Sequence, residues 1–251
     1  VGKARAEHAR VASRLFQALA TAAVTMAIIT TSEIKISALV QREHALNALR
    51  TVHSEFALDK VQSKEPTQLP SRDTSNQVNA AEVIERLQRD TGMESLMIDD
   101  ISLDDSQSRI TLSKVPNAPG IAAQLFDRVA AAGVFVDMIV QSYASSQIAD
   151  ITFTMPREQF DNALTVTNQV CEDFGCDKVD FKKTIAKLSV SGVGLRSHTG
   201  VAIGMFRALS DANINIESMN TSEVRVNVIV DGDSGQTGIQ CLREAFHNSL
   251  R

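Results

Sequence analysis

Two loops of this chain place a glycine directly before a predicted helix. Asn117-Ala118-Pro119-Gly120 leads into a helix expected over Ile121–Ala132, and His198-Thr199-Gly200 leads into one that runs to Leu209. The first turn of a helix presents unpaired backbone N–H groups and a partial positive charge, which suits a carboxylate. Glycine at that point lets a ligand approach the backbone closely. The pattern indicates binding of a small anion, and a plain tight turn with a helix cap explains either loop taken alone.

Each loop is followed by a strand that ends in polar residues. These are Gln141-Ser142 after the first loop, and Asn215 with Thr221-Ser222-Glu223 after the second. One end of such a site could hold an α-carboxylate, and the other an α-ammonium or a side chain. The combination favours an amino-acid ligand, while a salt bridge to Arg225 is the plain explanation of Glu223.

No set of residues in the chain has the spacing of a catalytic site. The five histidines lie in unrelated places, and Gly192-Val193-Gly194 lacks the lysine and long cradle of a phosphate-binding loop. The three cysteines do not have the spacing of a zinc site. We interpret them as reduced structural thiols, with a regulatory disulfide between Cys171 and Cys176 as the alternative. We therefore expect no catalytic residue, cofactor or metal in this chain.

The composition is that of an ordinary globular protein. Of the 251 residues, 43% are hydrophobic and 22% are charged, and the formal net charge is -5. A negative net charge gives no reason to expect nucleic acid or an anionic membrane as a partner. No apolar run approaches the roughly 18–20 residues of a membrane helix, and no signal peptide is evident. The expected location is cytoplasmic, and the missing initial Met indicates a piece of a longer chain.

The elements that would position the loops form a repeated unit. Thr221–Val226 repeats Thr31–Ile36 at an offset of 190 residues (221 − 31 = 190), and a third, looser copy lies between them. Phe16, Phe126 and Phe206 share one register in the three copies, where we expect them in the core face of a helix. The order helix, strand, strand, helix is most of a βαββαβ ferredoxin-like unit. The predicted fold class is therefore α+β.

The first copy is predicted from the spacing of its apolar residues. Helices are expected over Ala9–Ala22 and Glu43–Leu58, with strands over Val24–Thr30 and Ile34–Val40. The strand that should precede the first helix is missing from the sequence. The second helix should bury one side, which carries Leu46, Leu49, Val52, His53 and Phe56.

A polar segment separates the first copy from the other two. Residues 61–79 hold two prolines and almost no apolar side chain, so they predict a linker, and a short helix is expected over 80–93. Strands then follow over Ser95–Leu103 and Arg109–Val115, separated by an acidic turn at Asp104–Gln107.

Together these features resemble the regulatory region of aspartate kinase, which is built from paired ACT domains. The resemblance is carried by Val115–Gly120, Val136–Gln141, Asp150–Thr154, Gly192–Val201 and both Thr-Ser-Glu motifs. It implies tandem, partly interleaved ferredoxin-like domains. Residues 1–60 would form an ACT domain without its first strand, residues 108–182 a second, and residues 94–103 with 184–251 a third.

The resemblance also implies an amino-acid effector, threonine and/or lysine, bound between two domains. The first site would use Asn117, Pro119, Gly120, Ile121 and Ala122, with Gln141 nearby and Asn215 and Ile216 from the facing domain. The second would use His198, Gly200, Val201, Ala202, Ser222 and Glu223, with Asp137 as an ammonium partner. The family more often has Asp where this chain has Asn117, which leaves affinity and ligand choice open.

The first copy departs from the family pattern in its loop. At the offset of 190 residues the loop length is retained over Gly2–His8, but Gly200 becomes Arg10 and Asn215 becomes Thr25. An arginine where a ligand must approach the backbone would fill the pocket. We hypothesise that this copy is degenerate, with a structural role and no effector of its own.

By the same resemblance, the parent protein is an aspartate kinase under feedback inhibition in aspartate-family amino-acid biosynthesis. Its kinase domain, which uses ATP and Mg, and a further ACT domain are absent and would lie before Val1. An effector would shift the linked kinase toward an inactive state, and a homodimer is expected through the ACT domains. Two alternatives stay open: a free-standing amino-acid-binding ACT subunit, and a structural dimerisation module without a working pocket.

Overall fold

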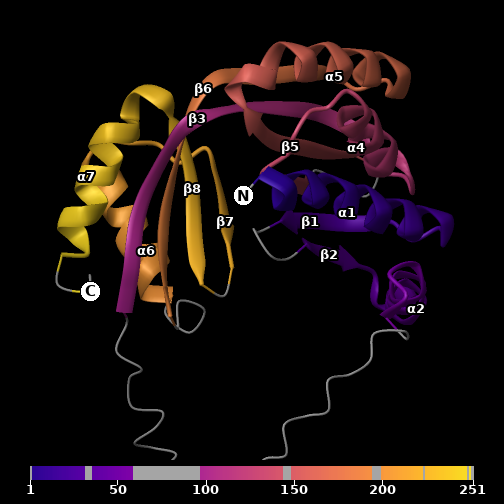
Figure 1. The fold of residues 1–251 in the computed structure, drawn as a ribbon, viewed down its shortest axis with the longest axis horizontal. Coiled ribbons are helices and arrows are strands. Elements are labelled where there is room, and N and C mark those ends of the chain that lie inside the picture. The colour runs from indigo at the N-terminus through magenta and orange to yellow at the C-terminus, as the bar shows by residue number, and fades with distance from the viewer. Residues whose placement is uncertain are drawn as a thin grey trace, which may run out of the picture.

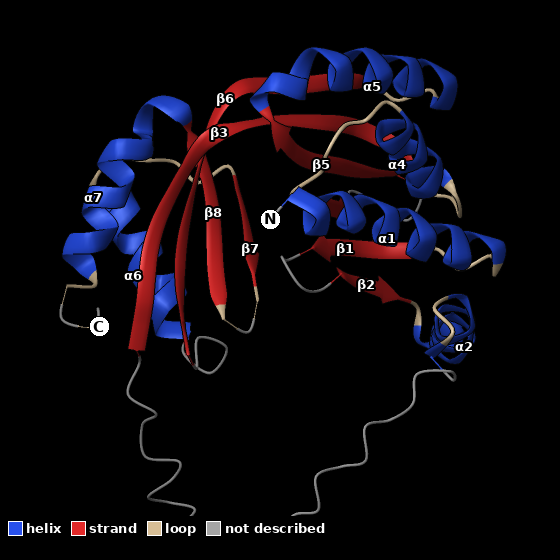
Figure 2. Cartoon of the chain, viewed as in Figure 1, coloured by secondary structure: helices blue, strands red, loops and turns tan. Residues whose placement is uncertain are grey.

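The computed structural model describes residues 2–31, 36–58, 97–143, 148–193, 199–222, 224–247 and 249. The predicted linker over 61–79 and the predicted helix over 80–93 lie outside these residues. All strands of the described part join one antiparallel sheet, in the order β2-β1-β4-β5-β3-β6-β8-β7. The sheet is strongly bent, and α5 and α7 lie on the outside of the bend (Figures 1 and 2). The α+β, ferredoxin-like fold class is confirmed.

Each of the three copies contributes helices and strands in the expected order. The first unit has α1 (Gly2–Thr21), β1 (Met26–Thr31), β2 (Ile36–Val40) and α2 (Ala45–Glu55). The middle part has β3 (Met97–Pro116), α4 (Ile121–Ala131), β4 (Ile139–Tyr143), β5 (Ile148–Pro156) and α5 (Phe160–Phe174). The last part has β6 (Lys178–Val193), α6 (Thr199–Asp211), β7 (Ser218–Thr221), β8 (Arg225–Asp231) and α7 (Gly235–Ala245). Short 3-10 turns precede α2, α5 and α7.

The loop expected over Gly2–His8 is wrong, because α1 already begins at Gly2. This stretch alternates alanine with charged straight-chain residues, which are strong helix formers. In addition, the position equivalent to Gly194 holds Ala4, so the first copy lacks a glycine that would favour a loop. The first unit has therefore exchanged its loop for an additional length of helix.

The acidic turn expected at Asp104–Gln107 is also wrong, since β3 runs without interruption through it. The strand is held by pairing with β6 along most of its length, and the turn is reduced to register shifts on either side of Gln107. The Asp104 carboxylate accepts hydrogen bonds from the backbone N–H and the hydroxyl of Ser106, at 3.0 and 2.6 Å. Such bulges bend a strand without ending it.

The two long strands are shared by two lobes. Met97–Asp104 pairs with Lys187–Val193, and Arg109–Ser113 pairs with Lys178–Lys182. The paired segments Arg109–Ser113 and Lys178–Lys182, together with α4, β4, β5 and α5, form what we call the middle lobe. The paired segments Met97–Asp104 and Lys187–Val193, together with α6, β7, β8 and α7, form the C-terminal lobe. Because β3 and β6 cross from one lobe to the other, the bend of the sheet lies within these two strands (Figure 1).

The first unit packs beside the middle lobe. β1 pairs with β4 through Ile29 opposite Gln141 and Thr30 opposite Val140, and α1 lies against α4. Phe16 and Phe126, which are 0% and 2% exposed, meet across the helix interface with ring centroids 5.7 Å apart. Their predicted place in the core is confirmed. The C-terminal lobe has a core of its own, against which Phe206 is only partly buried.

The side of α2 predicted to be buried is largely exposed. Leu46 and Leu49 are 57% and 65% exposed, and Ala48 is the buried residue of this helix. In the C-terminal lobe the equivalent of Leu49 is Ile239, which is 7% exposed because α7 packs on β3 and β6. Within the described residues the first unit has no counterpart of those two strands beyond β2, so α2 lacks the surface that would bury it. No described helix is long and apolar enough to cross a membrane.

Candidate functional site

The loop at the end of β3 has the geometry expected of a ligand-binding turn. Gly120 is the N-cap of α4 with φ of 91°, in the left-handed region that favours glycine, and no side chain caps the helix. A Cβ added to Gly120 would lie 3.6 Å from the Cβ of Ala20, so α1 passes close to this turn. The first turn of α4 therefore lies beside the space between the middle lobe and the first unit.

Gln141 connects the two sides of this space. Its side chain is 5% exposed, and its Nε2 donates a hydrogen bond to the Met26 carbonyl oxygen at 3.0 Å. Gln141 lies in β4 of the middle lobe, whereas Met26 begins β1 of the first unit. A buried amide needs such partners, so this bond fixes the register of the two units.

A small cavity lies between the loop, Gln141 and the first unit. The residues around it are Val24, Met26, Val115, Pro116, Asn117, Ala118, Pro119, Ile121, Ala122, Gln141, Ala149 and Ile151. Its volume is about 10 Å³, which is room for roughly one water molecule. The structure thus brings together the predicted loop residues and Gln141, and any amino acid bound here would have to separate the two units.

The facing side of the cavity differs from the sequence expectation. Asn215 and Ile216 precede β7 in the C-terminal lobe, where Asn215 is exposed and Ile216 packs against that lobe's own core. Within this chain the facing residues are Val24 and Met26 of the first unit. The offset of 190 residues places Met26 at the position of Ile216 (216 − 26 = 190), so applying the repeat to the facing residues as well would have found them.

The residues of the second predicted site lie at the far end of the C-terminal lobe. In the first turns of α6, Gly200 is exposed, Val201 is buried and Ala202 is half-buried. Ser222 forms a turn by donating its backbone N–H to the Arg225 carbonyl at 2.7 Å. The Gly192 N–H, near the end of β6, bonds the Val224 carbonyl at 3.0 Å, so this turn lies beside the strand that leads toward α6. His198 and Glu223 lie outside the described residues.

Asp137 is placed away from that group. Its Oδ2 accepts a hydrogen bond from Gln107 Nε2 at 3.0 Å and forms an ion pair with the Lys187 ammonium. Lys187 precedes Val193, the last residue of β6, by six residues (193 − 187 = 6), which is about 20 Å along a strand. Asp137 therefore already has an ammonium partner within the chain, at a distance from the start of α6.

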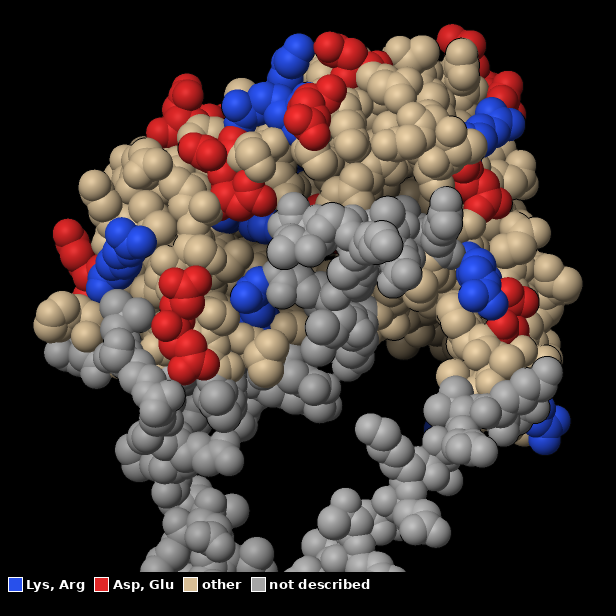
Figure 3. All heavy atoms as spheres, viewed as in Figure 1, with Lys and Arg blue, Asp and Glu red and all other residues tan. Residues whose placement is uncertain are grey.

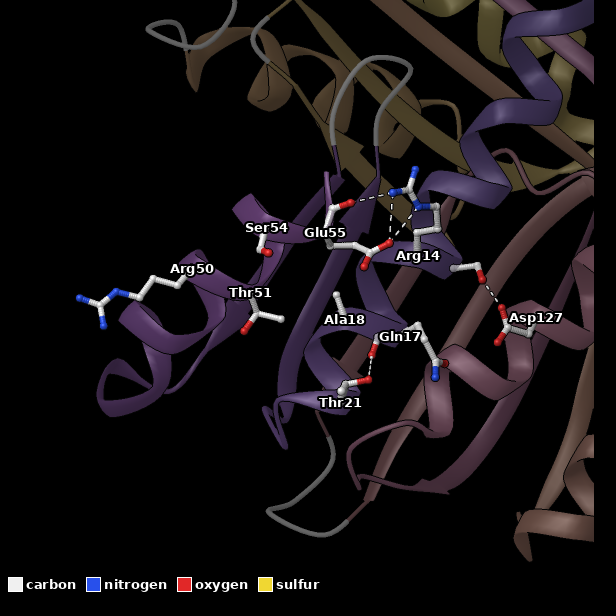
Figure 4. A pocket seen from close by; sticks show the side chains of 10 residues that line it. Arg14, Gln17, Ala18, Thr21, Arg50, Thr51, Ser54, Glu55 and Asp127 are labelled. Atoms are coloured by element: carbon white, nitrogen blue, oxygen red, sulfur yellow. Dashed lines mark hydrogen bonds and ion pairs between the residues drawn. The ribbon is translucent and has the colours of Figure 1, made fainter. Parts of the chain in front are cut away.

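A groove with a volume of about 610 Å³ lies between α1 and α2. Figure 4 shows that Arg14 and Glu55 point toward each other across it, while Arg50 points away. Arg14 donates to the Glu55 side chain at 3.1 Å and to its carbonyl at 2.7 Å, and lies 4.8 Å from the Phe56 ring. The ion pair between Arg14 and Glu55 is thus satisfied within the groove. None of the predicted effector residues lines this groove.

The cysteines and the charged surface add no second chemistry. All three cysteines are free, and burial together with the neighbouring Cys171 raises the pKa of Cys176 to about 12. A thiol that stays protonated at neutral pH is a poor nucleophile. On the face seen in Figure 3, acidic and basic side chains are interspersed, and neither sign covers an extended area of the described residues.

Comparison with known proteins assigns this architecture to a family. The sequence model of the ACT domain matches residues 1–56, 113–170 and 188–246. An aspartate kinase of Stutzerimonas stutzeri is 38% identical over 160 residues, which is 64% of this chain and 39% of that protein. An aspartokinase of Pseudomonas aeruginosa is 38% identical over 154 residues, or 61% of this chain and 37% of that protein.

Solved structures give the same result. The aspartate kinase from Synechocystis superposes with a TM-score of 0.75 at 29% identity, covering 95% of this chain and 37% of that one. The regulatory subunit of aspartate kinase from Thermus thermophilus, in a ligand-free form, has a TM-score of 0.55 at 33% identity and covers 59% of this chain and 99% of that one. The chain spans about two fifths of the length of the curated relatives it matches. The resemblance stated from the sequence is confirmed: the chain belongs to the ACT domain family, with the regulatory regions of aspartokinases as its relatives.

Proposed function

We propose that this chain is the amino-acid-binding allosteric regulatory region of an aspartate kinase. The observation that carries the proposal is the convergence of the Gly120 turn, the start of α4 and Gln141 on the backbone of Met26. Backbone N–H groups on one side and an amide and a carbonyl on the other suit a ligand with both a carboxylate and an ammonium. Threonine and lysine are the effectors we propose.

The chemistry of each contact follows from the groups present. The α-carboxylate would accept from the backbone N–H groups of Ile121 and Ala122 at the start of α4. In this structure the Ile121 N–H donates to the Ala118 carbonyl at 3.3 Å, so the ligand would take the place of that carbonyl. The α-ammonium would donate to the Met26 carbonyl, in place of the Gln141 amide that donates to it in this structure. Gln141 and Asn117 would then meet the ammonium or the side chain through their amide oxygens. Neither carries a charge, so the ligand's ammonium would be bound by dipoles.

Binding at this place implies a conformational response. A cavity of about 10 Å³ cannot hold an amino acid, so a bound effector stabilises an arrangement in which the first unit and the middle lobe have moved apart. We propose that this shift biases a kinase domain in the parent protein toward an inactive state, which gives feedback inhibition. The kinase reaction, with its ATP and Mg, would belong to that domain. A cytoplasmic homodimer, joined through ACT sheets, is part of the proposal.

Isothermal titration calorimetry with threonine and with lysine tests the proposed site. We expect saturable heat with at least one of them, and a loss of affinity of about ten-fold or more in Gln141→Ala, since a hydrogen bond to a charged group contributes about 1.5–3 kcal/mol. The control is Gln169→Ala, at an exposed position of α5 remote from the cavity, which should bind as the native chain does. Equal affinity in all three proteins would reject the site.

The closed cavity also supports a second candidate, a structural module that only joins domains. In that case the bond from Gln141 to Met26 is permanent, and neither amino acid gives heat or a thermal shift. A third candidate is a separate regulatory subunit, favoured by the match to almost the whole of the Thermus thermophilus regulatory subunit. Sequencing upstream of Val1 distinguishes it, because a kinase reading frame supports our proposal and a start codon supports the subunit.

A further inference from the structure

Two carboxylates occupy equivalent places in the two lobes. Asp137 precedes β4 and Glu217 precedes β7, in one register of the repeat (217 − 137 = 80). The backbone of each residue is bonded to a strand of its own lobe. The Asp137 N–H donates to the Thr154 carbonyl and the Glu217 N–H donates to the Ile229 carbonyl, both at 2.9 Å. Each carboxylate is therefore fixed to the lobe that carries it.

Each side chain, however, binds the part of a shared strand that belongs to the other lobe. Asp137 of the middle lobe pairs with Lys187, in the C-terminal part of β6. Glu217 of the C-terminal lobe pairs with Lys182, in the middle-lobe part of β6, and with Arg109, in the middle-lobe part of β3. The two ion pairs thus cross the lobe boundary in opposite directions. We call Asp137, Lys187, Glu217, Lys182 and Arg109 the reciprocal clamp.

The reciprocal clamp lies at the bend of the sheet and is mostly shielded from water. The side chains of Arg109, Glu217, Lys187 and Asp137 are 15%, 13%, 16% and 20% exposed. Lys182 is more exposed, and its hydrogen bonds with Glu217 and Asp231 raise its pKa. The register shifts of β3 fall on either side of Gln107, which is paired with Ile185 between the two lysines. A bulge at this point bends the strand, and the ion pairs lie across the bend.

One contact of the reciprocal clamp is not closed. Arg109 Nε and Glu217 Oε2 face each other at 3.5 Å, beyond the usual length of a hydrogen bond. Within the described part of the chain, both are buried atoms without a hydrogen-bond partner, as is Gln107 Oε1. A buried polar atom that lacks a partner is unfavourable. A small rotation of one lobe on the other would bring these two atoms within hydrogen-bond distance.

We propose that the reciprocal clamp sets the angle between the two lobes and is the device that allows this angle to take two values. Asp137 and Glu217 are then positioning residues for the lobes and not ligands for an effector's ammonium. The ion pairs of the reciprocal clamp are present without any ligand. Only a role of the clamp in regulation rests on the proposed function. An effector that separates the first unit from the middle lobe would act on β4, directly after Asp137, and so reach the C-terminal lobe through Lys187.

Distances between two spin labels test this proposal without a ligand. With the three cysteines replaced by serine, labels are attached at Asn168→Cys on α5 and Gln240→Cys on α7, both exposed positions on the outside of different lobes. The double variant Asp137→Asn, Glu217→Gln should broaden and shift the distribution of distances, and each single change should do so less. The matched control is Asp161→Asn, whose exposed partner Lys183 lies in the strand beside its own helix. A double variant with the distribution of the control would overturn the proposal.

A second pair of changes covers the case in which the carboxylate variants do not fold. Lys182→Gln with Lys187→Gln removes the cations instead, and the same broadening is expected. If both double variants unfold while the control stays folded, the proposal is also overturned. The ion pairs would then be needed for the folding of the lobes and not for the angle between them. If neither threonine nor lysine binds, the proposed function fails while the distance result still decides the role of the reciprocal clamp.

Discussion

At the scale of single residues, the proposed site is formed by backbone groups that a few residues hold in place. Gly120 turns the chain so that the start of α4 is open, and Gln141 holds the carbonyl of Met26 opposite it. The loop and Gln141 could be predicted from the sequence, since a glycine before a helix and a polar strand end are local patterns. Val24 and Met26 could not be found locally, because apolar residues at a strand start carry no signal of a site.

Gly120 should be intolerant of a side chain. Gly120→Ala forces a φ of 91° on alanine, and we expect a loss of about 1 kcal/mol in the free energy of unfolding. Gly200→Ala is the matched control, since it lies in α6, is exposed and has no atom within 4 Å of the added Cβ. There the change should be neutral or stabilising. Urea denaturation of both variants measures this, and an equal loss in the two would contradict the role of the turn.

Asp104 should make stability depend on acid pH. Burial alone would raise its pKa, but hydrogen bonds from Ser106, the charge of Lys187 and a hydrogen bond from Gln107 together lower the pKa from its ordinary value. A lowered folded-state pKa means that the stabilisation is present above the unfolded value and is lost as pH falls through the folded one. Asp104→Asn should therefore be less stable at neutral pH and lose less stability below about pH 4.

Denaturation curves at several pH values measure the acid dependence. Asp105→Asn, one residue along β3 at an exposed position, is the control for the removal of a carboxylate. If Asp104→Asn shows the same loss of stability on acidification as the native chain, the hydrogen bonds and ion pair at the bulge do not contribute as described.

At the scale of elements, the joint between α1 and α4 determines whether the first unit can face the loop. Ala20 of α1 lies beside Gly120, and the same helix carries Phe16 against Phe126. The order and type of these elements could be predicted, because amphipathic periodicity is a property of the sequence. The turn at Asp104–Gln107 could not be excluded, since polar residues in β3 are accepted only because β6 pairs beside them. The exposed side of α2 has the same explanation. Its sequence pattern is that of a buried helix, but tertiary packing determines whether that side is covered.

The equivalence of the three phenylalanines allows a controlled test of the joint. Phe16→Ala should cost about 3–5 kcal/mol of unfolding free energy, as expected for a fully buried aromatic side chain, and should weaken effector binding by loosening α1. Phe206→Ala should cost less, because that side chain is only partly buried, and should leave binding unchanged. Thermal denaturation and calorimetry on both proteins check this. Equal effects on binding would mean that the α1–α4 joint does not position the site.

At the scale of the whole molecule, the three units differ in what they retain of the repeat. The first unit retains the Thr-Ser-Glu motif but lacks the glycine-bearing loop, and it faces the proposed site, whose loop belongs to the middle lobe. The C-terminal lobe retains a loop and helix of the same kind, and is joined to the middle lobe through two shared strands. The sequence predicts that the first copy is degenerate, whereas its position against the loop of the middle lobe follows only from the pairing of β1 with β4.

The most direct measurement is the methyl spectrum of the methionines, labelled with 13C, during titration with threonine and with lysine. Met26 lines the proposed site, and Met205 is buried in the core of the C-terminal lobe. We expect the Met26 methyl resonance to shift saturably with at least one of the two amino acids and the Met205 resonance not to follow it. Gln141→Ala should weaken the affinity measured from the Met26 shift by about ten-fold or more. Binding by calorimetry with an unmoved Met26 resonance would contradict the placement of the effector between the first unit and the middle lobe.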